Sequence, residues 1–335
     1  EIELASKNLR SENSVGTIYF GGGTPSLLSE TQVETILSTI QSSYCVQSDA
    51  EVTLETNPGD MTDDKYRALR QIGVDRLSLG MQSAHDSELR RMGRRHCFTD
   101  TVRAVEIARS VGFTNLSLDL IFGYPGQSMN DWLCSLQSAL NLEPTHLSLY
   151  ALSIEDETPL GRSIANGVMT EIDDDELADR YDVAVDFLAQ NGWNRYEISN
   201  WSQSVETESC HNRQYWRLGE YLGFGAGAHG FVQEVRTQNT CNLEEYIMRM
   251  NSATESNRIR FPAAIETTPQ TKDEQMRDEM IFGLRLLREG VDLNRFAQRY
   301  GIDAEAIFAP FIEKHTAAGR LKIIRNGSAR NLVLN

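Results

Sequence analysis

The sequence predicts an α/β protein, an open or partial (β/α) barrel that is followed by a small, mainly helical domain. From Val15 to about Val232, the chain repeats one unit of an apolar strand, a polar turn, an amphipathic helix and a glycine. Strands that alternate with helices form parallel sheets with right-handed crossovers. Within several strands, leucines alternate with small or polar residues, as in Leu77, Ser78 and Leu79, which suits a curved sheet with a lined interior. Barrels of this kind bind their ligands at the C-terminal ends of the strands.

The repeat also predicts where the strands and helices lie. Strands are expected at residues 17–21, 51–57, 76–81, 115–123, 146–153 and 195–200. Thr62 is suited to cap a helix at 63–72, and Ser128 and Asp131 have capping-box spacing before a helix at 132–142. Further helices are expected at 101–111 and 175–191, each ended by a glycine.

After Val232 the repeat stops, which predicts a barrel over residues 1–235 and a second region over residues 236–335. Residues 236–275 are polar and are expected to form a connector with one short helix at 243–251. The remaining pattern predicts helices at 272–289, 292–300 and 304–315, and a strand at 321–324. We therefore expect a helical, winged-helix-like domain at the end of the chain.

Composition and charge exclude several classes of function. The chain has 335 residues, 32 basic and 48 acidic, and a net charge of −16, which repels the phosphates of nucleic acids and anionic membranes. No apolar run approaches the ~20 residues of a membrane span. Five scattered cysteines show no metal-ligand spacing or disulfide framework, as in a reducing compartment. We expect a cytoplasmic protein without a membrane span or nucleic-acid partner; its oligomeric state stays open.

Polar residues gather where the predicted strands end. The stretch TIYFGGGTPSLL joins a strand to a helix start, and its three glycines alone indicate a tight turn more often than a ligand site. Glu55 and Gln82 follow the next two strands, and Asp119 lies in the fourth. Because these strand ends meet at one mouth, we expect the three side chains to converge beside the backbone of residues 22–24. Such a group suits a zwitterionic ligand that carries a ribose.

The ordered set GGGTPSLL, LETNPG, RLSLGMQS, MGRRH, LDLIFGYPGQ, YEISNW and HNRQYW resembles the HemN/HemW branch of the radical SAM superfamily, from about Val15 to the end. The resemblance implies a partial (β/α)6 barrel with a HemN-type C-terminal domain, and S-adenosylmethionine across the strand ends. It implies seven residues that bind S-adenosylmethionine: Gly22, Gly23 and Thr24 at the methionine moiety, with Glu55, Gln82, Arg94 and Asp119. Arg94 is singled out by the resemblance alone.

One departure from the family concerns its [4Fe–4S] cluster. The family binds this cluster through CxxxCxxC, on a loop after a first strand upstream of GGGTP. This chain has no such sequence, and the residues before Thr17 contain no cysteine. We expect that the chain is truncated and lacks the first strand and the cluster loop. Since a cluster of this kind is held by cysteine thiolates, we expect that the chain as given holds no cluster and does not cleave S-adenosylmethionine.

The stretch from Cys210 to Trp216, CHNRQYW, is the second candidate site. From residue types alone, a histidine beside aromatic rings is a haem-iron ligand or, more often, a hydrogen-bonded loop histidine. The pattern HNxxYW resembles the signature of HemW-type haem chaperones. That resemblance implies haem at His211, Asn212, Tyr215 and Trp216, with His211 as the candidate iron ligand and with Cys210 and His229 ranked lower. His85 and His96, beside charged helices, are expected at the surface.

The resemblance implies a radical SAM haem chaperone that carries haem as cargo to a haem-accepting enzyme. The alternative is an oxygen-independent coproporphyrinogen III dehydrogenase, which oxidatively decarboxylates propionate side chains in haem biosynthesis. Both share the residues for S-adenosylmethionine, so only HNRQYW separates them within this chain. A third reading, a barrel enzyme that never used a cluster, rests on the fold alone, and the ordered motifs disfavour it. No catalytic residue is assigned.

Overall fold

The computed structural model describes residues 1–8, 14–253 and 261–335. The chain divides into two compact units. We call Ile18–Val33 with Glu51–Ser209 the barrel unit, and Glu1–Thr17, Glu34–Ala50 and Cys210–Asn335 the C-terminal unit. None of the helices in the described ranges is both long enough and apolar enough to cross a membrane.

Seven of the described strands form one large sheet in the order β1-β2-β3-β4-β5-β7-β6. The strands from β2 to β5 pair in parallel, and leucines on one face of this sheet, such as Leu77 and Leu118, are fully buried. The other face carries Ser78, Ser117 and Asp119, so the predicted alternation and fold class are confirmed. The strands are β1 (Val15–Phe20), β2 (Val46–Thr56), β3 (Arg76–Gln82), β4 (Asn115–Phe122), β5 (His146–Ala151), β6 (Asn194–Arg195) and β7 (Asn200–Ser202).

The predicted sixth parallel strand at 195–200 is wrong. The chain instead forms the short strands β6 and β7, and β7 runs antiparallel to β5 with Ser148 opposite Asn200. The fully buried Glu197 explains the break, because its carboxylate accepts hydrogen bonds from the backbone N–H of Ser199 at 2.8 Å and from the side chain of Asn200. A side chain that bonds its own neighbouring backbone replaces the ladder of a strand with a local turn.

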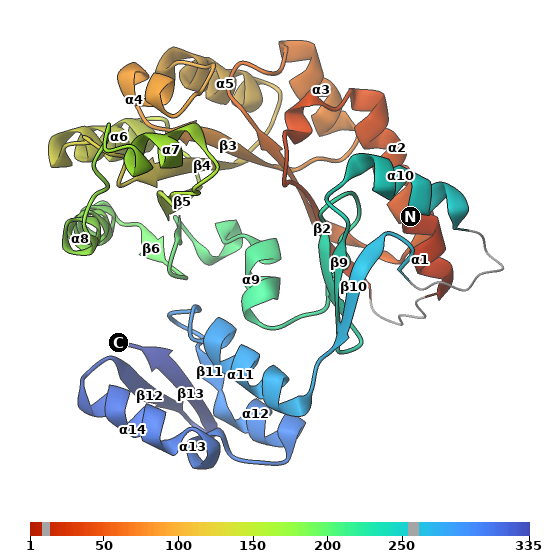
Figure 1. Cartoon of the computed structure of the whole chain (residues 1–335), viewed down its shortest axis with the longest axis vertical. Coiled ribbons are helices and arrows are strands. Elements are labelled where there is room, and N and C mark those ends of the chain that lie inside the picture. The colour runs from red at the N-terminus through yellow and green to blue at the C-terminus, as the bar shows by residue number, and fades with distance from the viewer. Residues whose placement is uncertain (9–13, 254–260) are drawn as a thin grey trace. The chain divides into compact units, whose positions relative to one another are not determined.

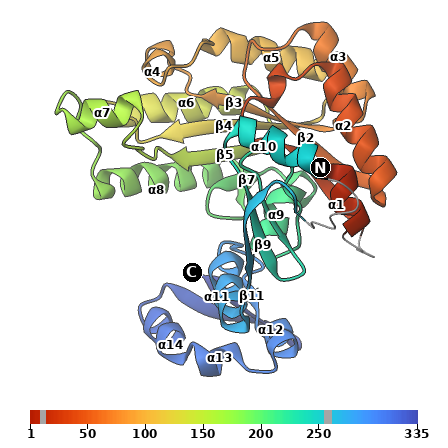
Figure 2. The ribbon, with the colours of Figure 1, turned by 45° about the vertical axis from the view of Figure 1, so that its right-hand side comes forward.

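Helices cover the outer side of the curved sheet, as Figure 2 shows for α3, α5, α6 and α8. Their predicted caps are confirmed. The Thr62 hydroxyl accepts from the backbone N–H of Lys65 at 3.3 Å, and Ser128 and Asp131 form a capping box. The helical elements are η1 (Pro25–Leu27), α2 (Glu30–Ser43), α3 (Asp63–Gln71), α4 (Asp86–Arg91), α5 (Phe98–Ser110), α6 (Met129–Asn141), α7 (Pro159–Ala165), α8 (Asp174–Gln190) and η2 (Val205–Thr207).

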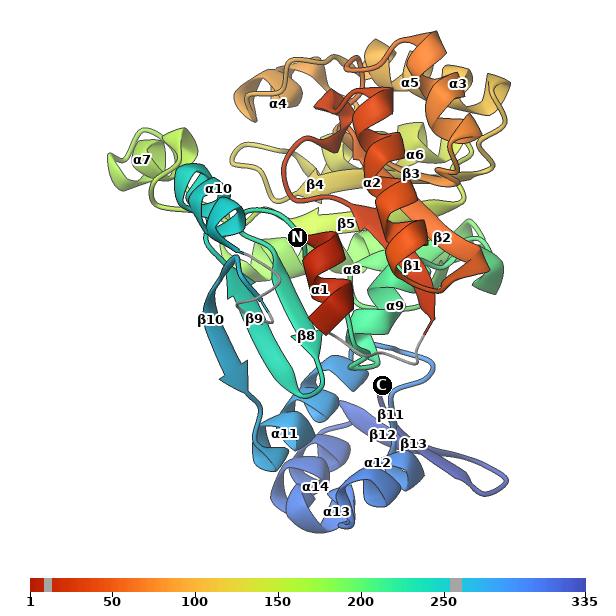
Figure 3. The ribbon, with the colours of Figure 1, turned by 90° about the vertical axis from the view of Figure 1, so that its right-hand side faces the viewer.

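The C-terminal unit contains an antiparallel sheet where a polar connector was expected. Strands β8 (His229–Val232), β9 (Val235–Asn239) and β10 (Ala264–Pro269) pair in the order β10-β9-β8, drawn side by side in Figure 3. Helix α10 (Leu243–Ser252) lies between β9 and β10 in sequence, and α1 (Ile2–Asn8) and α9 (Cys210–Trp216) belong to the same unit. Gln233 and Glu234 make the β8–β9 turn with φ of 49° and 62°, a signature of tight hairpins that is hard to predict without glycine.

The last part of the chain is a small helical domain with its own antiparallel sheet of order β11-β13-β12 (Figure 1, blue). Its core contains Met280, Phe296 and Leu332. The helix predicted at 272–289 ends at Gly283, and the one predicted at 304–315 breaks at Phe308, before a new helix begins at Ala309 with Pro310 in its first turn. The elements are α11 (Lys272–Gly283), β11 (Val291–Asp292), α12 (Leu293–Tyr300), α13 (Ala304–Ile307), α14 (Ala309–Ala317), β12 (Leu321–Asn326) and β13 (Ala329–Leu334).

Candidate functional site

The glycines after β1 bring a backbone amide to a carboxylate at the end of β2. Gly22 has φ of +88°, which a side chain rarely adopts. Its N–H donates to Glu55 Oε2 at 3.3 Å. A Cβ on Gly21 would come within 3.0 Å of Glu55 Oε1, whereas nothing lies within 4 Å of a Cβ placed on Gly23. Thr24 follows, half-buried, and its carbonyl accepts from Leu27 N–H as η1 begins.

Two carboxylates lie in this region, and each is held by hydroxyl groups. Tyr19 donates to Glu55 Oε1 at 2.7 Å, and Ser78 Oγ contacts both carboxylate oxygens of Asp119 at 3.0 and 2.9 Å. Burial raises the pKa of Asp119; hydrogen bonds from Ser148 and Ser78 oppose the rise, and the charge of Glu55 adds to it. Burial, then the charges of Glu55 and Asp119, raise the pKa of the Tyr19 hydroxyl as well. The two carboxylates therefore share one electrostatic environment.

Gln82 ends β3 in an unusual conformation. Its φ of 62° lies in the left-handed region, and the pairing of β3 with β4 shifts register between Leu79 and Gln82. The side chain is 8% exposed, and within the described residues its buried Oε1 has no hydrogen-bond partner. A non-glycine residue held in this region costs free energy, and such residues cluster at functional sites. Gln82 thus offers an unused acceptor atom.

Arg94 lies beside the same group of residues. Its Nη1 donates to Asn57 Oδ1 at 3.4 Å. Burial lowers the pKa of Arg94, and the charge of Asp119 counteracts that shift, so the guanidinium and the carboxylate are electrostatic neighbours. A Cβ on Gly80 would lie 2.8 Å from Gln82 Nε2 and 3.5 Å from Asn57 Oδ1. The structure therefore brings residues 22, 55, 82, 94 and 119 of the barrel unit together at the strand ends.

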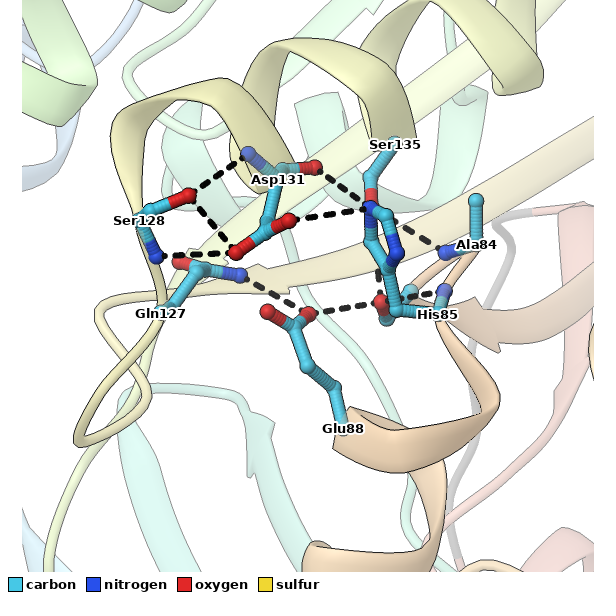
Figure 4. A network of polar contacts seen from close by, with 8 residues as sticks. Ala84, His85, Glu88, Gln127, Ser128, Asp131 and Ser135 are labelled. Carbon is cyan, nitrogen blue, oxygen red and sulfur yellow. Dashed lines mark hydrogen bonds and ion pairs between the residues drawn. The ribbon is translucent and has the colours of Figure 1, made fainter.

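A buried network joins the loops that follow β3 and β4 (Figure 4). Glu88 Oε2 accepts from Ser83 Oγ at 2.6 Å and from Gln127 Nε2 at 3.1 Å. Gln127 Oε1 in turn accepts from Gly123 N–H at 3.0 Å, and Ser135 Oγ lies 3.3 Å from Ser83 Oγ. We call Ser83, Glu88, Gln127 and Ser135 the Glu88 network. Because Ser83 directly follows Gln82, the network holds the backbone next to Gln82 in place.

In the C-terminal unit, His211 lies on α9 with both ring nitrogens in hydrogen bonds. Nδ1 is 2.9 Å from Thr17 Oγ1, and Nε2 is 3.0 Å from the hydroxyl of Tyr215, one helical turn later. The two rings meet edge to face with centroids 4.8 Å apart, and Tyr215 meets Tyr221 in the same way at 4.6 Å. Burial, with Tyr221 nearby, raises the pKa of Tyr215 to about 12. Thr17 and Tyr215 thus each contact one nitrogen of the imidazole, and Asn212, the next residue on the helix, is half-buried.

Trp216 lies on a different side of α9. The guanidinium carbon of Arg285 is 4.1 Å from the centre of the indole ring, and Phe282 is 6.2 Å away. Trp216 also lines a cavity of about 370 Å³ with Arg217, Glu279 and Arg288, among others. On an ideal helix, residues four apart share a face and residues five apart do not. The structure therefore pairs His211 with Tyr215 and packs Trp216 against α11. Cys210 and His229 are exposed.

Comparison with known proteins places this geometry in a family. Residues 1–137 match the Radical SAM superfamily and residues 270–327 the HemN C-terminal domain. The chain is 37% identical over 293 residues to heme chaperone HemW of Bacillus subtilis strain 168, covering 87% of this chain and 75% of that protein. It is 34% identical over 314 residues to heme chaperone HemW of Lactococcus lactis, covering 94% and 79%. The chain belongs to the HemW family.

The fold of the HemW family member described here is also that of a solved structure. Coproporphyrinogen III oxidase (HemN) from Escherichia coli superimposes with a TM-score of 0.81 over 99% of this chain and 78% of that one, at 20% identity. This likeness shows the fold. The boundary expected between residues 235 and 236 is tested by none of these matches and stays a prediction.

Membership of the radical SAM superfamily implies S-adenosylmethionine and a [4Fe–4S] cluster. Within the described residues, the buried Oε1 of Gln82 has no hydrogen-bond partner, and an acceptor of this kind fits the polar groups of S-adenosylmethionine. The cysteines do not fit the cluster: the sequence has no CxxxCxxC, all five cysteines are free thiols, and the described ranges contain no group of three metal-ligating side chains.

Sequence reasoning missed several residues of these sites. Thr17 is 194 residues from His211, and Glu88 is 39 from Gln127, so no local spacing reveals either contact. Tyr19 and Ser78 had a usable signal, since each alternates with apolar neighbours on its strand. The expectation that His96 lies at the surface is wrong: it is 8% exposed, and its Nε2 lies 3.4 Å from the carbonyl of Met81.

Proposed function

We propose that this chain is a haem chaperone of the radical SAM type, which binds haem as cargo and S-adenosylmethionine as cofactor and delivers the haem to a haem-accepting enzyme of the cytoplasm. The names of its relatives support this function. The single observation that carries it is the geometry of α9, where a half-buried imidazole is fixed through Nδ1 by Thr17 at 2.9 Å. An imidazole oriented through one nitrogen is suited to ligate a metal through the other.

For haem, His211 would ligate the iron through Nε2. Haem has large apolar faces, so aromatic contacts supply much of its affinity while one Fe–N bond fixes its orientation. Tyr215 and Asn212 stand next to His211 on the helix and would contact the porphyrin. Trp216, packed under Arg285 at 4.1 Å, would support the helix from its other side.

For S-adenosylmethionine, the group at the strand ends would hold the molecule by its polar parts. Gly22, Gly23 and Thr24 offer backbone groups to the methionine moiety, and Gln82 offers its amide. Carboxylates accept hydrogen bonds from ammonium and ribose hydroxyl groups, which are the parts that Glu55 and Asp119 would bind beside Arg94. In radical SAM proteins, a bound [4Fe–4S] cluster would supply the electron for radical chemistry on this cofactor; for this chain we propose binding alone.

The alternative function, an oxygen-independent coproporphyrinogen III dehydrogenase, is supported by the structural likeness to HemN. That likeness has a TM-score of 0.81 but only 20% identity, so it extends to the fold and not to the reaction. The HNRQYW sequence of α9 favours the chaperone.

Haem titration of the full chain tests the proposal. We expect wild type to bind haem with the optical spectrum of an imidazole-ligated iron, and His211→Ala to lose that spectrum and to bind haem at least tenfold more weakly. His229→Ala is the matched control, because His229 is an exposed histidine of the same unit and should leave the spectrum unchanged. If His229→Ala instead removes the imidazole spectrum, or if neither variant alters it, His211 is not the ligand.

A further inference from the structure

Nε2, the nitrogen of His211 that would bind haem iron, already has a hydrogen-bond partner within the protein, the hydroxyl of Tyr215. Nδ1 is turned towards Thr17 of β1, and Nε2 is 3.0 Å from the hydroxyl of Tyr215. Both partners and the imidazole belong to the C-terminal unit. The Tyr215 ring is held edge-on between His211, at 4.8 Å, and Tyr221, at 4.6 Å.

The chemistry of the two hydroxyl groups sets the tautomer of the imidazole. A neutral imidazole donates through one nitrogen and accepts through the other. A phenol is more acidic than an aliphatic alcohol and is therefore the better donor, which favours the tautomer in which Tyr215 donates to Nε2. In that tautomer Nδ1 carries the proton and donates to Thr17 Oγ1. This is the tautomer in which Nε2 has the free electron pair that a metal ion requires.

We propose that Tyr215 caps the iron-binding nitrogen of His211 and leaves it when haem binds, while Thr17 holds the imidazole in the tautomer that receives the iron. This inference rests on the proposed function and adds two positioning residues to it. When haem binds, the hydrogen bond between the Tyr215 hydroxyl and Nε2 would break and a bond between the iron and Nε2 would form. The imidazole keeps its proton on Nδ1 throughout. The hydroxyl is freed and turns away from the imidazole.

Removal of the cap should strengthen haem binding. Tyr215→Phe keeps the ring and its edge contacts but has no hydroxyl, so haem no longer has to break a hydrogen bond of ordinary net strength. We expect about 2- to 10-fold tighter haem binding with an unchanged imidazole spectrum. Tyr221→Phe removes the hydroxyl of the neighbouring ring, which bonds Arg236, and should leave the affinity as in wild type.

Loss of the tautomer support should act in the opposite direction. Thr17→Val keeps the shape of the side chain and removes the acceptor of Nδ1–H, so we expect about 2- to 10-fold weaker haem binding, and Thr17→Ser should restore it. The tautomer can also be measured without haem, from the ¹³Cδ2 and ¹⁵N chemical shifts of the His211 ring. Wild type should show the Nδ1–H form, and Thr17→Val a mixture.

The outcomes separate the inference from the function on which it rests. If His211→Ala binds haem with the wild-type spectrum, the haem function of α9 fails. If His211 is required but Tyr215→Phe binds haem equally or more weakly, Tyr215 is no cap. An iron–phenolate absorption band that is lost in Tyr215→Phe would make Tyr215 itself the ligand and also overturn the inference, as would an Nε2–H tautomer in haem-free wild type.

Discussion

At residue 82, two local penalties coincide. Gln82 has φ of 62°, and its buried Oε1 has no partner within the described residues. A left-handed backbone costs an ordinary residue roughly 1–2 kcal/mol, and an unpaired buried acceptor costs about 1–3 kcal/mol. The surrounding chain overcomes both penalties, because the Glu88 network ties the next residue, Ser83, in place. A ligand that donates to Oε1 would remove the second one.

We predict that replacements of Gln82 separate the two penalties. Gln82→Gly should be more stable than Gln82→Ala by about 1 kcal/mol, because only glycine adopts this φ without strain. Both variants should bind S-adenosylmethionine at least tenfold more weakly than wild type. Chemical denaturation and calorimetric titration measure the two quantities. Equal stabilities would show that the backbone angle is not enforced, and unchanged affinities would remove Gln82 from the binding site.

At the scale of elements, hydrogen bonds of the Glu88 network connect α4 to the loop after β3 and to the loop after β4. Glu88 is 4% exposed, and its Oε2 is the shared acceptor of Ser83 and Gln127. Gln127 also accepts from the backbone of Gly123 and lies at the start of the turn into α6. A substitution of Glu88 is therefore expected to disturb the loops at the ends of both β3 and β4, although α4 itself is short (Asp86–Arg91).

We predict that Glu88→Ala lowers the free energy of unfolding by about 1–3 kcal/mol, because Ser83 and Gln127 lose a buried acceptor. Glu88→Gln keeps one acceptor oxygen and should lose less. Binding of S-adenosylmethionine should weaken in the same order, since the support of Gln82 is loosened. The matched control is Glu106→Ala, an exposed glutamate of α5, which should stay within about 0.5 kcal/mol of wild type. A Glu88→Ala protein as stable as this control would contradict the prediction.

Local rules predicted elements well where the decisive atoms are close in sequence. The Ser128 and Asp131 capping box forms as expected, with bonds of 3.2 and 3.1 Å. The prediction at 195–200 failed because Glu197 turns its buried carboxylate onto its own backbone, which residue type and spacing do not reveal. Strands β9 and β10 were missed because their residues are polar, and pairing, not composition, makes them strands.

The candidate sites follow the same division. Glu55, Gln82 and Asp119 could be grouped from sequence because parallel strands end at one edge. The partners of His211 could not be predicted, since Thr17 lies 194 residues away and is an ordinary strand residue in the sequence. The motif HNRQYW led to a single aromatic site, whereas the structure places Tyr215 on His211 and Trp216 against Arg285.

At the scale of the whole molecule, a fully buried histidine makes folding sensitive to acid. His146 is 0% exposed and bonds the hydroxyls of Ser117 at 2.7 Å and Tyr196 at 2.8 Å. Burial, then the charge of Arg76, lowers its pKa well below the usual 6.5. In the unfolded chain His146 takes up a proton as the pH falls through about 6.5, whereas in the folded chain it stays neutral at that pH. Stability from this residue is therefore complete above pH 6.5 and is lost as the pH falls below it.

We predict that this residue sets part of the acid limit of the protein. The free energy of unfolding of wild type should fall relative to that of His146→Gln between pH 7 and pH 5, so that the gap between the two proteins narrows. The magnitude of the net charge of both proteins falls in the same way as the pH approaches the isoelectric point near 4.9. The difference between their free energies of unfolding therefore reports on His146. Denaturant titrations at pH 5, 6 and 7 measure it, and a constant gap would show that His146 does not titrate on unfolding.

The cavity beside Trp216 is lined by a carboxylate that binds one arginine of α9 and the arginine that follows the helix. Glu289 pairs with Arg213 at 2.8 Å and, through two bonds, with Arg217 at 2.7 and 2.8 Å. These arginines flank Tyr215 in the sequence, so the helix is clamped on both sides of the residue that covers His211. If the helix stays in place, the departure of Tyr215 that we propose requires rotation of its own side chain and no local unfolding, which takes microseconds to seconds.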